Sequence, residues 1–310
     1  MTRFVVEQWA PGYGASVADD GLDRAKEPVD PSVEVPVDRW EPRWPDAPGG
    51  GPAVVAFVDG VRRIDCRVWF TDGPHPRPGL CASVAAGAVL CQPGSARVTT
   101  VEGERGLHTT ADGVDDLKVP GVGTYEVHRL EGDDDDETLS GGVGRHMTEL
   151  ELRVSRTLEG AGLVVFDGPL RGRREVTGVG YVKTQHVEYL EPGLLPVVFA
   201  LEAGQRTPLF AVGGQFPRWS WYLRLPGPRA HGLTGVVRLE LPGLGDAAGA
   251  AERADEVSAC LPRFASQAHK EARAPQNLYP IAGLEHHLRH RLGDPFLLER
   301  HLRLAAHSAA

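Results

Sequence analysis

The sequence predicts an α/β protein with a mixed sheet flanked by helices. Strand-like and helix-like runs interleave along the chain, which is the order expected of an α/β or mixed α+β fold. The first strand-like runs also follow one another with only Gly/Pro turns between them. With 310 residues, 41% of them hydrophobic, the chain can bury a substantial core.

Residues 1–50 differ from the rest because they are rich in proline and acid, and we interpret them as an extended N-terminal arm. Residues 51–310 are expected to form one domain. Its first part contains β-like runs at 53–72, 79–94 and 96–106, which predict an antiparallel meander. The acidic run 131–137, EGDDDDE, is interpreted as a solvated loop, with cation binding as the alternative.

A helix is predicted over residues 138–162, and on its wheel Glu151 falls beside the apolar stripe whereas Glu149 points away. A strand that ends in Asp167 follows, and then a basic loop, RGRREV, and a segment that carries Lys183. Further β-like runs lie at 195–202, 207–214, 218–226 and 235–242, and helices are expected at 246–272 and 281–294.

Composition limits the possible functions. The net charge of -9, from 33 Lys and Arg against 42 Asp and Glu, excludes nucleic-acid binding through bulk charge, so any polyanion site must be local. The apolar runs are far shorter than the roughly 18 residues of a membrane span, and the start MTRFVVEQWAPGYG lacks a secretory signal. We therefore expect a cytoplasmic protein without a membrane anchor. The cysteines show no close CxxC pairs and are expected to be buried thiols: Cys66, Cys81, Cys91 and Cys260.

The sequence contains two apolar, strand-like runs that are predicted to stop at Asp-Gly: VVAFVDGV with Asp59, and LVVFDGPL with Asp167. Asp-Gly is also a common turn dipeptide, so each aspartate alone is explained by a turn. Two carboxylates at strand ends, with Glu151 leaning in from the helix between them, would repel one another unless a cation lay among them. Oxygen ligands favour a hard divalent ion, Mg²⁺ or Mn²⁺, and such ions support phosphodiester cleavage.

Four motifs carry a resemblance to a known family: FVDG at 57–60, VVFDGPL at 164–170, GYVK at 180–183 and RAPQNLYPIAGLEHHL at 273–288. In this order, from about residue 54 to 292, they resemble the signatures of NurA-type nuclease domains. The resemblance implies an RNase H-like core and Mn²⁺- or Mg²⁺-dependent cleavage of DNA during end processing or repair. It also implies a homodimer and a HerA-type hexameric translocase ATPase as partner.

Carried over residue by residue, the resemblance implies that Asp59, Glu151 and Asp167 are the metal-binding carboxylates. Glu149 remains the alternative to Glu151. Tyr279 and a following histidine would complete the catalytic site. His287 is chosen over His286 because it lies nearer the apolar edge of the last predicted helix.

Basic and aromatic residues around this site are candidates for DNA binding. Lys183 supplies a point charge suited to a phosphate, and Arg171, Arg173 and Arg174 follow Asp167 closely enough to hold the DNA backbone. Each of these has a solvated surface position as its alternative. Trp219 and Trp221 offer stacking surfaces for unpaired bases, although their alternation also fits one face of a strand.

Two other functions stay open: a catalytically inactive dimeric adaptor of an ATPase, and another RNase H-like endonuclease. The presence of all three carboxylates argues against the adaptor. No GxxxxGK[ST] motif occurs, so any ATP-driven motion must come from another subunit.

Overall fold

The computed structural model describes residues 4–6, 23–71, 73–170, 178–183, 187–227, 229, 232–271 and 273–309. The α-helices are α1 (Asp136–Ser155), α2 (Leu195–Ala200), α3 (Ala247–Cys260), α4 (Tyr279–Arg291) and α5 (Pro295–Ala309). Short 3-10 helices are η2 (Val37–Arg39) and η3 (Leu261–Phe264). The strands are β1 (Phe4–Val6), β2 (Asp23–Arg24), β3 (Val29–Asp30), β4 (Val55–Phe70), β5 (Arg77–Gln92), β6 (Ser95–Thr109), β7 (Leu117–Val119), β8 (Gly123–Arg129), β9 (Leu163–Asp167), β10 (Val179–Val182), β11 (Val187–Glu188), β12 (Phe210–Val212), β13 (Arg218–Arg224) and β14 (Val236–Pro242).

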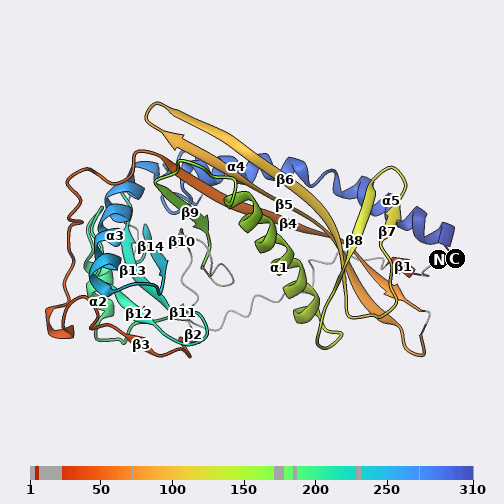
Figure 1. Cartoon of the computed structure of the whole chain (residues 1–310), viewed down its shortest axis with the longest axis horizontal. Helices are drawn as coiled ribbons and strands as arrows, with labels where there is room; N and C mark the ends of the chain where they lie inside the picture. Colours follow the sequence, from red (N-terminus) through yellow and green to blue (C-terminus); the bar gives the residue numbers. More distant parts are fainter. Residues whose placement is uncertain are drawn as a thin grey trace.

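A large mixed sheet forms the centre of the molecule (Figure 1). Among the described strands its order is β3-β12-β13-β14-β10-β9-β4-β5-β6-β8-β7, with β1 added beside β4. Strands β4, β5 and β6 form the predicted antiparallel meander. After α1 the chain returns as β9, which is parallel to β4, and β10 is parallel to β9. The predicted fold class, a mixed sheet with an RNase H-like strand order and flanking helices, is confirmed.

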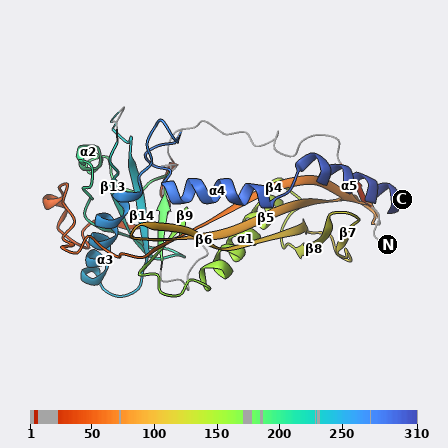
Figure 2. The ribbon, with the colours of Figure 1, turned by 90° about the horizontal axis from the view of Figure 1, so that it is seen from above.

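Helices cover both faces of this sheet, as Figure 2 shows for α1 and α4. Alternate residues of β4 face opposite sides: Phe57 belongs to the core under α3 and α4, and Val58 belongs to the core under α1. The strands that lie between the helices of the two faces are therefore apolar on both sides, as a sheet covered on both faces requires. Strand β5 meets this requirement with small residues. At Gly87 a Cβ would approach Leu288 and Leu284 of α4 to 3.1 and 3.2 Å, so the glycine permits close packing of the helix.

The meander extends well beyond the α/β core. Strands of this length span about 50 Å, and their far ends meet α5, β7 and β8 (Figure 1). A separate apolar cluster fills this end, which includes Val68, Leu107, Tyr125 and Leu302. Because β7 and β8 are short, with few consecutive apolar residues, the sequence pattern did not predict them.

Three local predictions need correction. Residues 195–202 are not a strand, because α2 begins there with Pro196 in its first turn, a position that favours helix initiation. The helix predicted over 246–272 ends at Cys260, where Pro262 leads the chain into η3. The acidic run 131–137 is more than a solvated loop, since Asp135 caps α1 by accepting a hydrogen bond from the Thr138 amide at 2.7 Å.

Part of the region 1–50 is attached to the sheet. Strand β3 pairs with β12, and Trp40 is buried in the core over β12 and β13. Glu34 forms an ion pair of 2.8 Å with the fully buried Arg206, whose guanidinium also contacts Asp255 at 2.6 Å. The division into an arm and a domain stays a prediction.

The four cysteines are buried and free, as predicted. No helix in the described part of the chain combines the length and the apolar composition needed to cross a bilayer.

Candidate active site

Asp59 lies where the central sheet divides. Strands β4 and β9 pair in parallel as far as Val58 and Phe166, after which β9 ends at Asp167 and β4 continues to Phe70. Asp59 is therefore not at a strand end, and the prediction that this apolar strand stops at Asp-Gly is wrong. Asp59 and Gly60 do not form a turn either, because both lie within β4. The side chain of Asp59 is buried, and Oδ1 accepts a hydrogen bond from the Gly60 amide at 2.8 Å.

Asp167 does end its strand, and the chain turns at Gly168, which has a φ of 94°. Lys183, just after β10, donates a hydrogen bond to Asp167 Oδ2 at 2.6 Å and to Asn277 Oδ1 at 3.0 Å. The other carboxylate oxygen, Oδ1, is buried and has no hydrogen-bond partner among the described residues. One oxygen of Asp167 is thus held by Lys183, and the other remains available to a ligand.

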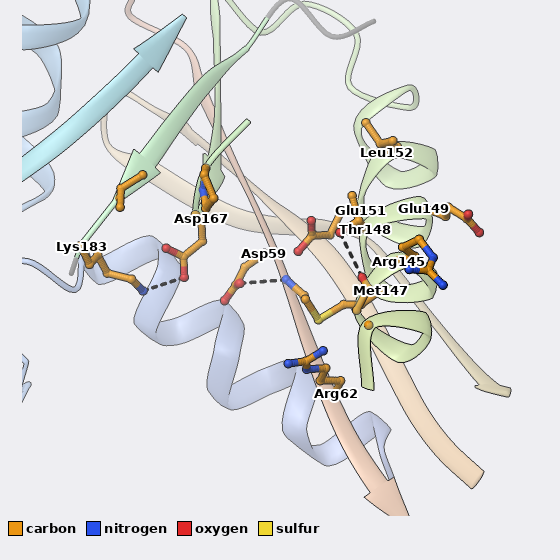
Figure 3. Close-up of a pocket in the computed structure, with 16 residues that line it drawn as sticks. Asp59, Arg62, Arg145, Met147, Thr148, Glu149, Glu151, Leu152, Asp167 and Lys183 are labelled. Atoms are coloured by element: carbon orange, nitrogen blue, oxygen red, sulfur yellow. Dashed lines mark hydrogen bonds and ion pairs between the residues drawn. The ribbon is translucent and has the colours of Figure 1, made fainter. Parts of the chain in front are cut away.

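Glu151 reaches this site from α1, whereas Glu149 lies on the outer side of the same helix (Figure 3). Glu151 is buried and Glu149 is exposed. The approach of Glu151 depends on Gly60, since a Cβ at that position would stand 2.6 Å from Glu151 Oε1 and 2.8 Å from Met147 Cγ. The role of Gly60 is therefore to make room for α1, and it does not form a turn.

The three carboxylates face a common pocket, in which Asp59 lies between Asp167 and Glu151 (Figure 3). The cavity has a volume of about 820 Å³. Exposed Arg62 and Arg145 also line it. Cationic groups therefore lie on the β4 and α1 sides of the cavity.

Burial is the largest influence on the acidity of the two aspartates. Burial, followed by the charges of Asp167 and Glu151, raises the pKa of Asp59 well above its usual value. Burial also raises the pKa of Asp167, and the positive charge of Lys183 opposes this without cancelling it. The single positive charge of Lys183 is too little for this group of three carboxylates. A divalent cation would supply the missing charge and would find only oxygen ligands, so the residues fit Mg²⁺ or Mn²⁺.

Tyr279 and the histidines of α4 do not line this cavity. Tyr279 is the first residue of α4, and its hydroxyl accepts a hydrogen bond from the Gln267 amide at 3.2 Å. His286 and His287 are exposed. The charges of Glu285 in α4 and of Arg273 before it nevertheless influence the pKa of Asp167.

The remaining predicted DNA-binding residues have different outcomes. Arg171, Arg173 and Arg174 lie outside the described residues. Trp221 is fully buried and donates a hydrogen bond to Ser258 Oγ at 2.9 Å, so it belongs to the core and offers no stacking surface. Trp219 is partly buried against the same core.

Sequence reasoning missed Gly60 and Asn277 as parts of the site. Gly60 was seen only as half of a turn dipeptide, because its contact with α1 depends on the tertiary structure. Asn277 precedes Tyr279 in the motif NLYP and is fully buried. An asparagine in a proline-bounded segment predicts a turn, and no sequence signal pairs it with a lysine 94 residues away.

The chain matches a known protein family and is similar to solved structures. The family model described as NurA domain matches residues 54–286. Among solved structures, the chain is similar to the NurA nuclease from Sulfolobus solfataricus, with a TM-score of 0.52 and 12% identity, over 87% of this chain and 88% of that one. At this identity the likeness shows the fold. No curated protein sequence matches the chain.

Two further structures are endonucleases. The Bacillus subtilis endonuclease V has 14% identity and a TM-score of 0.36, over 77% of this chain and 80% of that one. The catalytic domain of human endonuclease V has 14% identity and a TM-score of 0.38, over 88% and 92%. These TM-scores are too low to support an inference.

Proposed function

The chain belongs to the NurA domain family, and from this premise we propose that it is a divalent-metal-dependent nuclease that hydrolyses phosphodiester bonds in DNA. The observation that carries the proposal is the convergence of Asp59, Glu151 and Asp167 on one pocket. They come from β4, α1 and β9, three separate elements of the fold. An inactive adaptor would have no need of three acids that face one pocket.

Asp59, Glu151 and Asp167 are the residues that would hold Mn²⁺ or Mg²⁺. When bound, such an ion activates a water molecule and stabilises the leaving oxygen of the phosphodiester. Lys183 holds Oδ2 of the Asp167 carboxylate through the 2.6 Å contact, which leaves Oδ1 for the ion. Its charge also favours the approach of a phosphate to the pocket.

Arg62 and Arg145 would contact the DNA backbone at the rim of the pocket, because exposed cations bind phosphates without regard to sequence. Arg171 and Arg173 are assigned the same role from the sequence. Tyr279 and His287 are retained as catalytic candidates on the strength of the family resemblance.

The direct test is cleavage of end-labelled DNA by the purified chain with Mn²⁺, with Mg²⁺ and with EDTA. We expect cleavage only with an added ion, and its loss in Asp59→Asn and Asp167→Asn. The matched control is Glu149→Gln, which removes an exposed acid from the edge of the same pocket and should keep the activity. Cleavage by both Asp variants, or in EDTA, would refute the proposal. Single-stranded RNA and damaged duplexes in parallel reactions test the alternative of another RNase H-like endonuclease.

We also propose a homodimer. Support comes from family membership and from the exposed apolar side chains of α5, Phe296, Leu297 and Leu304, which are 80%, 55% and 55% exposed. A patch of this kind is typical of a surface that a partner chain covers. Light scattering should give twice the mass of the 33.4 kDa chain. The double substitution Phe296→Asp/Leu304→Asp should then yield a folded monomer.

The proposed partner is a HerA-type hexameric translocase ATPase, and the proposed role is DNA end processing or repair in the cytoplasm. These rest on family membership, together with the absence of a GxxxxGK[ST] motif from this chain. Co-purification with such an ATPase, and a gain in cleavage on ATP addition, would be the supporting results. A chain whose cleavage is the same with and without the ATPase would contradict the partnership.

A further inference from the structure

A cluster of three histidines lies away from the carboxylate pocket, under α1. His108 of β6 and His128 of β8 are direct neighbours in the parallel pairing of these strands. His146 of α1 lies against both, with its ring centroid 4.0 Å from that of His128 and 5.4 Å from that of His108. One ring nitrogen from each residue lies within 4.8 Å of the others.

Gly106 creates the space for these rings. A Cβ at this position would lie 2.7 Å from His108 Nε2, 2.8 Å from His128 Cδ2 and 2.9 Å from His146 Nδ1. All three imidazoles thus converge on the surface of a single glycine. Packing alone does not require this arrangement, since an apolar side chain would fill the same space without placing polar nitrogens in it.

The polar atoms of the cluster are incompletely paired. His108 is fully buried and His128 is half-buried, yet His108 Nδ1 and His128 Nε2 have no hydrogen-bond partner among the described residues. The His146 Nδ1 to His108 Nε2 distance is 3.4 Å, which is long for a hydrogen bond. It does match the roughly 3.3 Å edge between two nitrogens bound at 2.0–2.1 Å to a tetrahedral ion.

The outer part of the cluster also resembles the surroundings of a metal-binding histidine. Glu104 Oε2 lies 2.9 Å from His146 Nε2, and Arg153 holds the other oxygen of Glu104 at 2.5 Å. A carboxylate that accepts the Nε2 proton fixes the tautomer, so the Nδ1 lone pair of His146 faces the other histidines. Burial, followed by the charges of His128 and His146, lowers the pKa of His108 to about 3. That imidazole is therefore neutral at pH 7, the form that binds metals.

We propose that His108, His128 and His146 bind a divalent transition-metal ion, with zinc as the favoured ion. Imidazole nitrogens select zinc and its neighbours over Mg²⁺ and Mn²⁺, which prefer oxygen. This site is thus chemically distinct from the carboxylate pocket. The ion would fasten α1 to β6 and β8, with the ring nitrogens, which lie within 4.8 Å of one another, drawn closer around it. Because α1 also carries Glu151, the ion would steady the helix that completes the carboxylate site.

The test uses the full chain without a polyhistidine tag, stripped with a chelator and reloaded with one equivalent of Zn²⁺ in excess Mg²⁺. Magnesium occupies the oxygen site, so zinc retained after dialysis reports the histidines. We expect about one zinc per chain by mass spectrometry, and with Co²⁺ instead the strong visible absorption of tetrahedral cobalt. Zinc should also raise the melting temperature. These readouts do not involve DNA cleavage, so their failure is independent of the proposed nuclease.

Two variants remove ligands without leaving a large cavity. His146→Phe keeps the ring volume, and His128→Ala changes a half-buried side chain. Both should lose retained zinc and the zinc-dependent shift in melting. The matched control is His286→Ala, because the exposed pair His286 and His290, with Nε2 atoms 3.4 Å apart, is the competing zinc site. Loss of zinc in His286→Ala, or equal retention by wild type and His146→Phe, would overturn the proposal.

Discussion

Gly60 lies in contact with Glu151 so closely that any side chain at position 60 would collide with the carboxylate: its Cβ would stand 2.6 Å from Glu151 Oε1. Asp59 and Gly60 thus both contribute to the arrangement of the carboxylates. The aspartate supplies one acid of the site, and the glycine lets α1 bring the next acid beside it.

Gly60→Ala is therefore expected to displace Glu151 and lower cleavage by about 10²-fold, the usual cost of moving a catalytic group by 1 Å. Metal affinity, measured by calorimetry with Mn²⁺, should fall as well. The control is Gly141→Ala on α1, where a Cβ would meet only Arg145 at an ordinary 3.6 Å. Equal rates for the two variants would show that the site does not need the present position of Glu151.

The two glutamates of α1 should separate cleanly by substitution. Glu151→Gln removes a buried charge from the pocket and should abolish cleavage, whereas Glu149→Gln changes an exposed side chain and should leave the rate within about two-fold, as expected of a surface change. Initial rates in Mn²⁺ measure both. If Glu149→Gln were the inactive variant, the assignment of the helical ligand would have to be reversed.

The pH dependence of the stability of the ion-free protein should reflect the raised pKa of Asp59. Burial, followed by the charges of Asp167 and Glu151, raises the pKa of Asp59 above its ordinary 3.8. The folded protein then binds this proton more tightly than the unfolded chain, so the contribution is stabilising below pH 3.8 and is lost as pH rises through the folded pKa. The melting temperature of Asp59→Asn, relative to that of wild type, should therefore rise as pH increases from 3.8 through the folded pKa of Asp59. Melting curves in EDTA at several pH values test this, with Glu149→Gln as control.

Sequence patterns predicted the parts of the fold that depend on local periodicity. Strand β9 lies at residues 163–167, as predicted, and α1 begins within two residues of its predicted start. The wheel argument that favoured Glu151 over Glu149 agrees with their burial, because helical spacing alone decides which face a residue occupies. The short apolar run of α2 was read as a strand, since strand and helix are not distinguishable over so few residues.

Long-range relationships were beyond the sequence patterns. The meeting of Lys183 with Asn277, and of His108 with His128 and His146, depends on strand pairing and on the path of α1 across the sheet. Neither group shows a fixed spacing that chemistry requires. The convergence of Asp59 with Asp167 was expected from the fold that the resemblance implied, because in that fold a strand parallel to the first returns its aspartate beside the first one.

Tyr279 is expected to contribute to turnover without supporting the fold. It is 37% exposed, and its hydroxyl accepts a hydrogen bond from the Gln267 amide. Tyr279→Phe should thus lower the cleavage rate and leave the melting temperature unchanged, and His287→Ala should do the same. Steady-state cleavage and thermal melting of each variant provide the measurement. An unchanged rate in Tyr279→Phe would confine this tyrosine to a structural role.

Lys183 should act on the site through Asp167. Its ammonium lies 2.6 Å from Asp167 Oδ2 and opposes the effect of burial on that carboxyl. Lys183→Met would remove the largest opposition to burial, so the pKa of Asp167 should rise and the acidic limb of the cleavage profile should move to higher pH. Lys183→Arg keeps the charge and should move the profile less. A second role at the phosphate would appear as a weaker salt dependence of DNA binding in Lys183→Met. If the salt dependence weakens while the pH profile stays in place, Lys183 acts on DNA and not through Asp167.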